Sequence, residues 1–235
     1  VSIYYNQPIM KQLILITFLS LLFIQKGFSQ ESSELRNNIG IKVMPLSMID
    51  YTPRLRFGLE YISNKKLGYS IDFGIGNKFL NQWRLDGMIW GQDYSFYEIR
   101  PEIKYLFVNN KNYYFYSALE LFYLNMKDIL ESGHYKKENS NVETTYESAR
   151  FNKQKYGVHL KGGINLIISE RLNFDFYGGF GFAKRTISYT DVLNPVDGTE
   201  SIFVEWAPKN YLFEGESIIF HMTLGVKIGY TFWIK

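Results

Sequence analysis

Residues Ile218 to Lys235 read IIFHMTLGVKIGYTFWIK, and this stretch decides the fold. Every even position from Ile218 to Ile234 is apolar, whereas most odd positions are small or polar, as at His221 and Thr223. Because successive side chains of a strand point to opposite faces, the pattern predicts a two-faced strand about twice the usual globular length. A β-barrel that spans a membrane is the first architecture that needs such a strand.

The same alternation recurs along the chain. Leu67, Tyr69 and Ile71, for example, alternate with Gly68 and Ser70. Such period-2 segments, separated by turn-forming residues, are typical of strands. Eight segments fit the pattern, with these approximate bounds: 38–45, 53–62, 67–76, 95–108, 113–126, 154–168, 171–187 and 217–235.

The connections between these segments alternate in length. Short turns fall at 64–66, 109–112 and 169–170, and longer polar connections fall at 46–52, 77–94, 127–153 and 188–216. An up-and-down barrel with both termini at one end produces this alternation. We therefore expect an all-β fold, an up-and-down antiparallel transmembrane β-barrel of eight strands, in one domain at 30–235.

The N-terminal segment indicates export. Met10 and Lys11 precede an apolar run at 13–24, and Gly27-Phe28-Ser29 places small residues before a cut ahead of Gln30. A basic start, a run of about a dozen apolar residues and a small-x-small site are typical of a cleaved signal peptide. We assign residues 1–29 to an upstream extension, Val1–Ile9, followed by this signal peptide.

Composition excludes several classes of function. Hydrophobic residues make up 46% of the chain at a mean hydropathy of −0.17, so apolar and polar residues are interleaved. The net charge of +3 gives no basic excess for nucleic-acid binding, and the absence of cysteine excludes disulfides and thiolate metal sites.

A soluble barrel with its apolar face inward is the alternative. The apolar face carries on the order of forty large side chains, more than the interior of an eight-stranded barrel holds. The glycines fall on the polar face, as at Gly58, Gly74 and Gly163, where a crowded interior needs small residues. We therefore place the polar face inside and the apolar face toward lipid.

The segment Tyr97–Phe107, YEIRPEIKYLF, together with the barrel pattern, resembles the small outer-membrane barrels of Gram-negative bacteria, the OmpA/OmpX-like proteins, and an uncharacterised subset of them in particular. The resemblance implies a location in the cell outer membrane, and we expect a monomer there. Its implied partners are outer-membrane lipid and the barrel-insertion machinery. An unknown extracellular partner is left open.

Charged residues fall on the expected inner face, and we call them the interior ionic network. Its members are Lys42, Arg54, Arg56, Glu60, Asp72, Glu98, Arg100, Glu102, Lys104, Glu120, Lys161, Asp175 and Lys227. Lys155 and Arg185 are also expected to face inward. The set could line an ion-selective pore or form paired charges that plug a narrow lumen. We favour the plug, because water-filled channels belong to barrels of many more strands.

Catalytic signals are weak. His134 falls in a polar loop, whereas His159 and His221 face inward, and His221-Met222-Thr223 is the nearest approach to the site of a lipid-modifying enzyme. No phosphate-binding loop and no metal-ligand spacing occurs. We expect no catalytic residue, cofactor or metal.

The long connections carry large apolar residues. We assign possible surface contacts to Trp83, Trp90, Phe203 and Trp206, since exposed apolar clusters often mark binding surfaces. They could instead pack at the rim. The sequence thus favours a structural or cell-surface interaction protein. A small porin-like pore and a lipid-modifying enzyme remain as alternatives.

Overall fold

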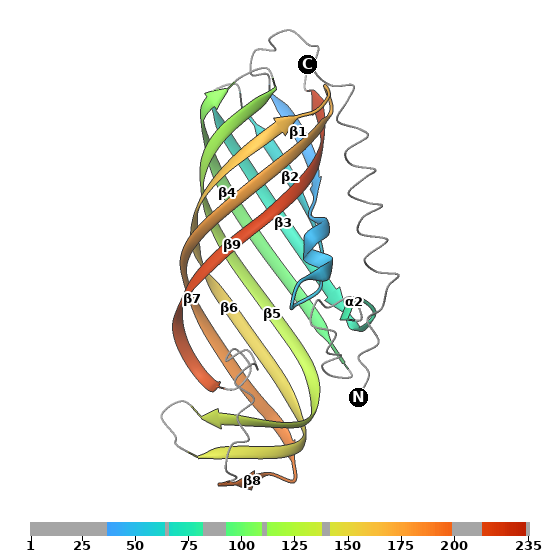
Figure 1. Ribbon diagram of the computed structural model, residues 1–235, viewed down its shortest axis with the longest axis vertical. Coiled ribbons are helices and arrows are strands. Elements are labelled where there is room, and N and C mark those ends of the chain that lie inside the picture. The colour runs from blue at the N-terminus through green and yellow to red at the C-terminus, as the bar shows by residue number, and fades with distance from the viewer. Residues whose placement is uncertain are drawn as a thin grey trace, which may run out of the picture.

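The computed structural model of the chain describes residues 37–63, 66–81, 93–109, 112–137, 142–198 and 213–233. Strands dominate it (Figure 1). In chain order the elements are β1 (Asn38–Val43), the 3-10 helix η1 (Pro45–Ile49), β2 (Leu55–Ile62), β3 (Leu67–Asn77), the short helix α2 (Lys78–Asn81), β4 (Ser95–Asn109), β5 (Tyr113–Lys137), β6 (Glu143–Ile167), β7 (Leu172–Leu193), β8 (Val196–Asp197) and β9 (Phe213–Trp233).

Antiparallel pairing closes the strands into a barrel. Each of β1 to β7 pairs with its neighbour in sequence, β7 pairs with β9, and β9 returns to β1. The closing register runs from Asn38 opposite Trp233 to Val43 opposite Ile228. The predicted all-β antiparallel barrel is confirmed. The described residues contain nine strands rather than eight, because the two-residue β8 pairs with the far end of β6.

The strands differ greatly in length. β1 has 6 residues and β2 has 8, whereas β5 and β6 have 25 each. The tight turns that end in Lys66, Asn112 and Arg171 share one end of the barrel with the start of β1 and the end of β9, which we call the short-turn end (Figure 1). At the opposite end, β5, β6 and β7 continue well beyond the other strands.

The prediction of a long loop at 127–153 is wrong. β5 and β6 pair across most of this segment, from Lys127 opposite Asn152 to Lys136 opposite Glu143. His134 therefore lies in a strand and not in a polar loop, with its Nε2 3.3 Å from a carboxylate oxygen of Glu143. The alternation is hard to see in this segment because the outward positions are polar. The contrast between an apolar outer face and a charged inner face is therefore lost.

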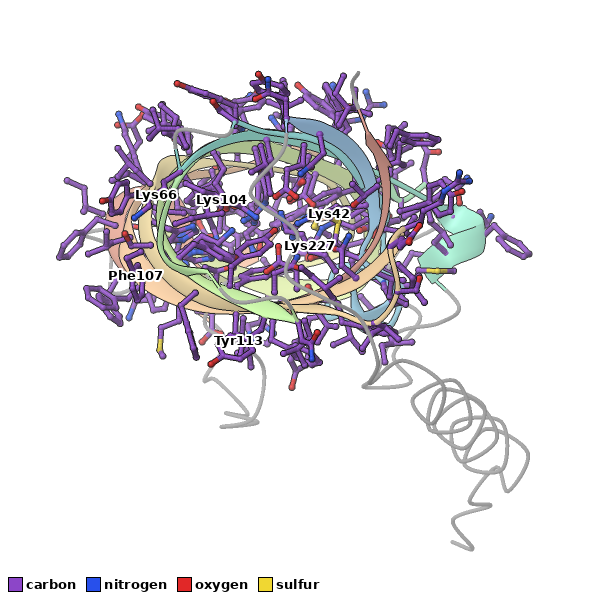
Figure 2. The ribbon with its side chains drawn as sticks, turned by 90° about the horizontal axis from the view of Figure 1, so that it is seen from above. Lys42, Lys66, Lys104, Phe107, Tyr113 and Lys227 are labelled. Atoms are coloured by element: carbon purple, nitrogen blue, oxygen red, sulfur yellow. The ribbon has the colours of Figure 1, made fainter. Side chains whose placement is uncertain are left out.

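The two faces of the wall are those that the alternation predicts. Leu119, Leu160 and Phe180 are about half exposed on the outside, at 52%, 54% and 54%. Figure 2 looks down the barrel and shows Lys42, Lys104 and Lys227 inside the ring, with Phe107 outside it. An apolar exterior around a charged interior is the arrangement of a membrane-spanning barrel. In the part of the chain that the structure describes, no helix is long and apolar enough to cross a membrane.

The predicted signal peptide and upstream extension, residues 1–29, lie outside the described residues.

A charge on the outer face should destabilise the barrel according to its depth. Leu119 faces outward near the middle of the apolar band, opposite Ile103 on β4 and Leu160 on β6. Leu119→Arg should lower the unfolding free energy by about 2–4 kcal/mol, measured by urea titration in lipid vesicles. Glu131→Arg, on the same face but in the outer extension of β5, is the matched control and should change it by about 1 kcal/mol or less. Equal effects would contradict the assigned membrane depth.

Candidate functional site

All thirteen residues of the interior ionic network are buried, each less than a tenth exposed. Seven are cations and six are carboxylates, and they come from β1 to β7, β9 and the residue before β2. The strand alternation directs them inward, and closure of the barrel then brings distant strands together. Their pairing could not be read from the sequence, since it depends on the register of each strand pair and on contacts across the lumen.

Asp175 of β7 is the centre of one group of contacts. One of its carboxylate oxygens accepts hydrogen bonds from the ammonium groups of Lys42 at 2.7 Å and Lys104 at 2.9 Å. The other accepts a hydrogen bond from the Tyr116 hydroxyl at 2.6 Å. Glu60 of β2 bridges the same two lysines at 2.8 and 2.7 Å. Apart from the Lys42–Glu60 bond between the neighbouring strands β1 and β2, these bonds join strands that are not neighbours in the wall, so they cross the lumen.

A second group gathers around Glu98 and Glu120. Arg100 donates to both carboxylates, at 2.9 and 2.8 Å. Arg54 donates to Glu98 at 2.7 Å, and Lys161 donates to Glu120 at 2.9 Å. Lys161 also pairs with Glu102. The two carboxylates are therefore held by several cations each, which offsets their desolvation.

Asp72 ties β9 to this arrangement. It accepts a hydrogen bond from Lys227 at 2.8 Å and another from Arg56 at 3.1 Å. Arg56 also donates to the Tyr177 hydroxyl at 3.0 Å. The Tyr177 ring in turn lies 4.1 Å from the Lys161 ammonium, a cation–π contact that fills space between charges.

Two histidines meet inside the barrel. His159 Nδ1 lies 2.9 Å from Glu120, and its Nε2 lies 2.6 Å from Nδ1 of His221. The Phe122 ring stacks on His159 at 4.5 Å between centroids. Sequence alternation indicated that both histidines face inward but missed their contact. The contact follows from the strand register. His159 of β6 and His221 of β9 lie opposite Gly181 of β7 on its two sides, so no side chain separates the two imidazoles.

The chemistry open to this histidine pair is limited. Among the residues that the structure describes, no Ser or Thr hydroxyl hydrogen-bonds to either imidazole. The Thr223 hydroxyl, which the sequence suggested as a neighbour of His221, is therefore not activated by it. Nor does any group of three or more potential metal ligands occur in the described ranges.

Apolar side chains fill the interior beyond the network, toward the end opposite the short turns. Sequence reasoning missed this cluster, because much of it lies in the strand extensions. Burial beside Tyr135 raises the pKa of the Tyr146 phenol in the β6 extension to about 12. We call this cluster the outer apolar cluster. The buried members of the cluster are Tyr94, Phe96, Phe122, Leu124, Met126, Leu130, Tyr135, Tyr146, Ala149, Phe151, Ala183, Ile187 and Tyr189.

The proposed surface contacts cannot be placed. Trp83, Trp90, Phe203 and Trp206 lie outside the described residues.

The Asp175 contacts predict a large stability effect. Asp175→Asn keeps the volume and the acceptor for Tyr116 but removes the charge between Lys42 and Lys104. We expect a loss of about 3–5 kcal/mol in unfolding free energy, as for other buried pairs that lose one partner. Asp191→Asn is the matched control, since this exposed carboxylate pairs with Arg150 at 3.3 Å and should contribute less than about 1 kcal/mol. Similar losses in the two variants would refute the buried pairing.

A glycine beside the network should also be sensitive to substitution. A Cβ at Gly74 would lie 2.5 Å from Cγ of Glu98, whereas one at Gly40 would lie 3.4 Å from the nearest atom, the Tyr230 carbonyl oxygen. Gly74→Ala should push Glu98 away from Arg54 and cost about 1–3 kcal/mol. Gly40→Ala, also on the inner face, should leave the unfolding midpoint nearly unchanged. The reverse order in a denaturant titration would contradict the packing.

Comparison with known proteins gives a family but little beyond it. Among solved structures, the chain is similar to a major outer membrane protein from Thermus thermophilus, with 8% identity and a TM-score of 0.42, covering 84% of this chain and 99% of that one. It is also similar to CarO from Acinetobacter baumannii, with 12% identity and a TM-score of 0.40, covering 87% and 100%. No curated protein matches it in sequence. A family profile described as "Protein of unknown function (DUF3575)" matches residues 14–212, most of the chain, which therefore belongs to that family.

Proposed function

We propose that the protein is a monomeric integral outer-membrane barrel whose lumen is closed by the interior ionic network, and that it acts as a structural or cell-surface interaction protein of the OmpA/OmpX-like kind. The observation that carries the proposal is the set of bonds from Lys42 and Lys104 to Asp175. They join β1, β4 and β7 inside the barrel, and Figure 2 shows Lys42 and Lys104 within the ring.

The pairing of charges within the interior ionic network supports closure rather than conduction. An ion-selective pore needs an excess of one sign along an open path. Within the interior ionic network seven cations face six carboxylates, and its members form buried ion pairs with one another. An ion that passed would have to break these pairs, and separating buried charges is costly.

The outer face supports the location. Its exposed side chains near the short-turn end are apolar or aromatic, such as Tyr105, Phe107 and Phe232. Aromatic girdles border the apolar band of outer-membrane barrels. A soluble protein would leave this large apolar surface in water, which is unfavourable.

Conductance and stability measured together test the proposal. Purified wild-type protein in a planar lipid bilayer should show no channel openings. Lys104→Met should lower the unfolding free energy, because it leaves Glu60 and Asp175 short of a cation. The opposite outcome has two parts: the wild type conducts ions, and Lys104→Met shifts the selectivity toward cations without changing the stability. That outcome would contradict the closed barrel and indicate a pore.

A further inference from the structure

Lys155 on the inner face of β6 lacks the pairing that the network cations have. It is only 8% exposed, yet no described residue forms a hydrogen bond or ion pair with its ammonium group. Its strongest electrostatic neighbours are Arg185, Arg100 and Arg54, which repel it, and Asp50 is the weaker one that attracts it. The side chain is largely buried and its charge has no ion-pair partner among the described residues, so this position would favour a nearby anion.

The nearby carboxylates are already occupied. Glu98, in the same hydrogen-bonded row of the wall as Lys155, accepts bonds from Arg54 and Arg100. Glu120 lies two inward-facing rows closer to the short-turn end. It accepts hydrogen bonds from Arg100, Lys161 and the His159 ring. Glu98 and Glu120 are therefore engaged by other cations and are not paired with Lys155.

Further donors lie beside Lys155. Arg185 stands directly opposite on β7, and its Nε donates to the Ser217 hydroxyl of β9 at 3.1 Å. Ser217 belongs to the same row, two strands or roughly 10 Å from Lys155. An anionic group between β6 and β9 would thus meet an ammonium, a guanidinium and a hydroxyl.

The surroundings of these donors are apolar. Leu124 of the outer apolar cluster lies opposite Lys155 on its other side. Ile219, two residues from Ser217 on the inner face of β9, packs against the same cluster. A ligand for this place must therefore join a negative charge to an apolar body.

Among the described residues, the strand pairing of the wall is incomplete next to Lys155 and Arg185. β1 pairs with β9 only from Ile228 to Trp233, and from Gly215 to Val226 no described strand pairs with that edge of β9. In Figure 1, β9 crosses in front of β5 and β6. The outward side chains here are unusually exposed, at 79% for Ile218 and 88% for Leu224. This edge would open the interior to the outer leaflet of a membrane.

We propose that a long-chain carboxylate binds here, with its acyl chain along the unpaired edge of β9 against Ile219 and its head group on Lys155 and Arg185. The ligand would have at most a single chain, because the interior of an eight-stranded barrel holds little beyond its own side chains. The site lies on the outer side of the interior ionic network, so it requires no open pore. The proposal goes beyond the barrel's structural role, which would stand without it.

Photo-crosslinking tests the site directly. The folded wild-type barrel in zwitterionic lipid nanodiscs is exposed to hexadecanoate carrying a terminal diazirine, or to hexadecanol with the same label. We expect the carboxylate to label inner-face residues of β9 and the outer apolar cluster, with a yield about tenfold above that of the alcohol, since a charge-assisted contact distinguishes them. Equal labelling by both probes, or labelling confined to outward residues such as Phe182 and Phe220, would overturn the proposal.

Variants separate the head-group contact from general affinity for the barrel. Lys155→Met should lower the inner-face yield of the carboxylate probe about tenfold and leave the alcohol unchanged. Lys184→Met is the matched control, because this cation lies next to Arg185 but faces outward and pairs with Glu216 at 2.7 Å. Its yield should equal that of the wild type. Unchanged labelling in a folded Lys155→Met barrel would refute the site, and if that variant does not fold, the two probes on the wild type still decide. Channel recordings, which test the closed lumen, are independent of both outcomes.

Discussion

The hydrogen bonds between β1 and β9 are the constraint on which the rest of the structure depends. A chain in hydrocarbon must pair its backbone groups internally, and a sheet can do so only by closing on itself. The closure uses the register from Asn38–Trp233 to Val43–Ile228. Once the wall is closed, alternate side chains of every strand are forced into either the lumen or the surroundings. The positions of Lys42 on β1 and Lys227 on β9 inside the barrel follow from this closure.

Space in the lumen then decides which residues fit. The Tyr116 ring lies over the position where a Cβ at Gly163 would be, and the Tyr177 ring does the same at Gly225. Each large ring thus requires a glycine on a neighbouring strand. The rings in turn contact lysine ammonium groups, with Lys104 lying 4.3 Å from the Tyr116 ring centroid. Small residues are therefore as necessary to the interior as the charges, since they make room for the groups that separate like charges.

The sequence predicts the barrel well and its interior only in part. Alternation is a local property, so the inward direction of Glu98, Arg100 and Glu102 can be read directly from 98–104. Their partners cannot, because Arg54 and Lys161 reach them through register and across the lumen. The extensions of β5 and β6 were missed since their outward residues are polar, and alternation between apolar and charged faces is lost there. The contact of His159 with His221 needs the pairing of three strands and has no local signal.

The lumen has a polar half and an apolar half, and the boundary between them is where charge and solvation are least balanced. In the polar half, Asp72 and Asp175 each hold two lysine or arginine groups, so these charges are paired. Lys155 lies at the boundary, buried against Leu124 and beside Arg185. A barrel that needed only stability would gain more from an apolar residue there, since an unpaired buried ammonium group opposes folding. The balanced charges therefore account for the fold, and the unbalanced one points to a ligand.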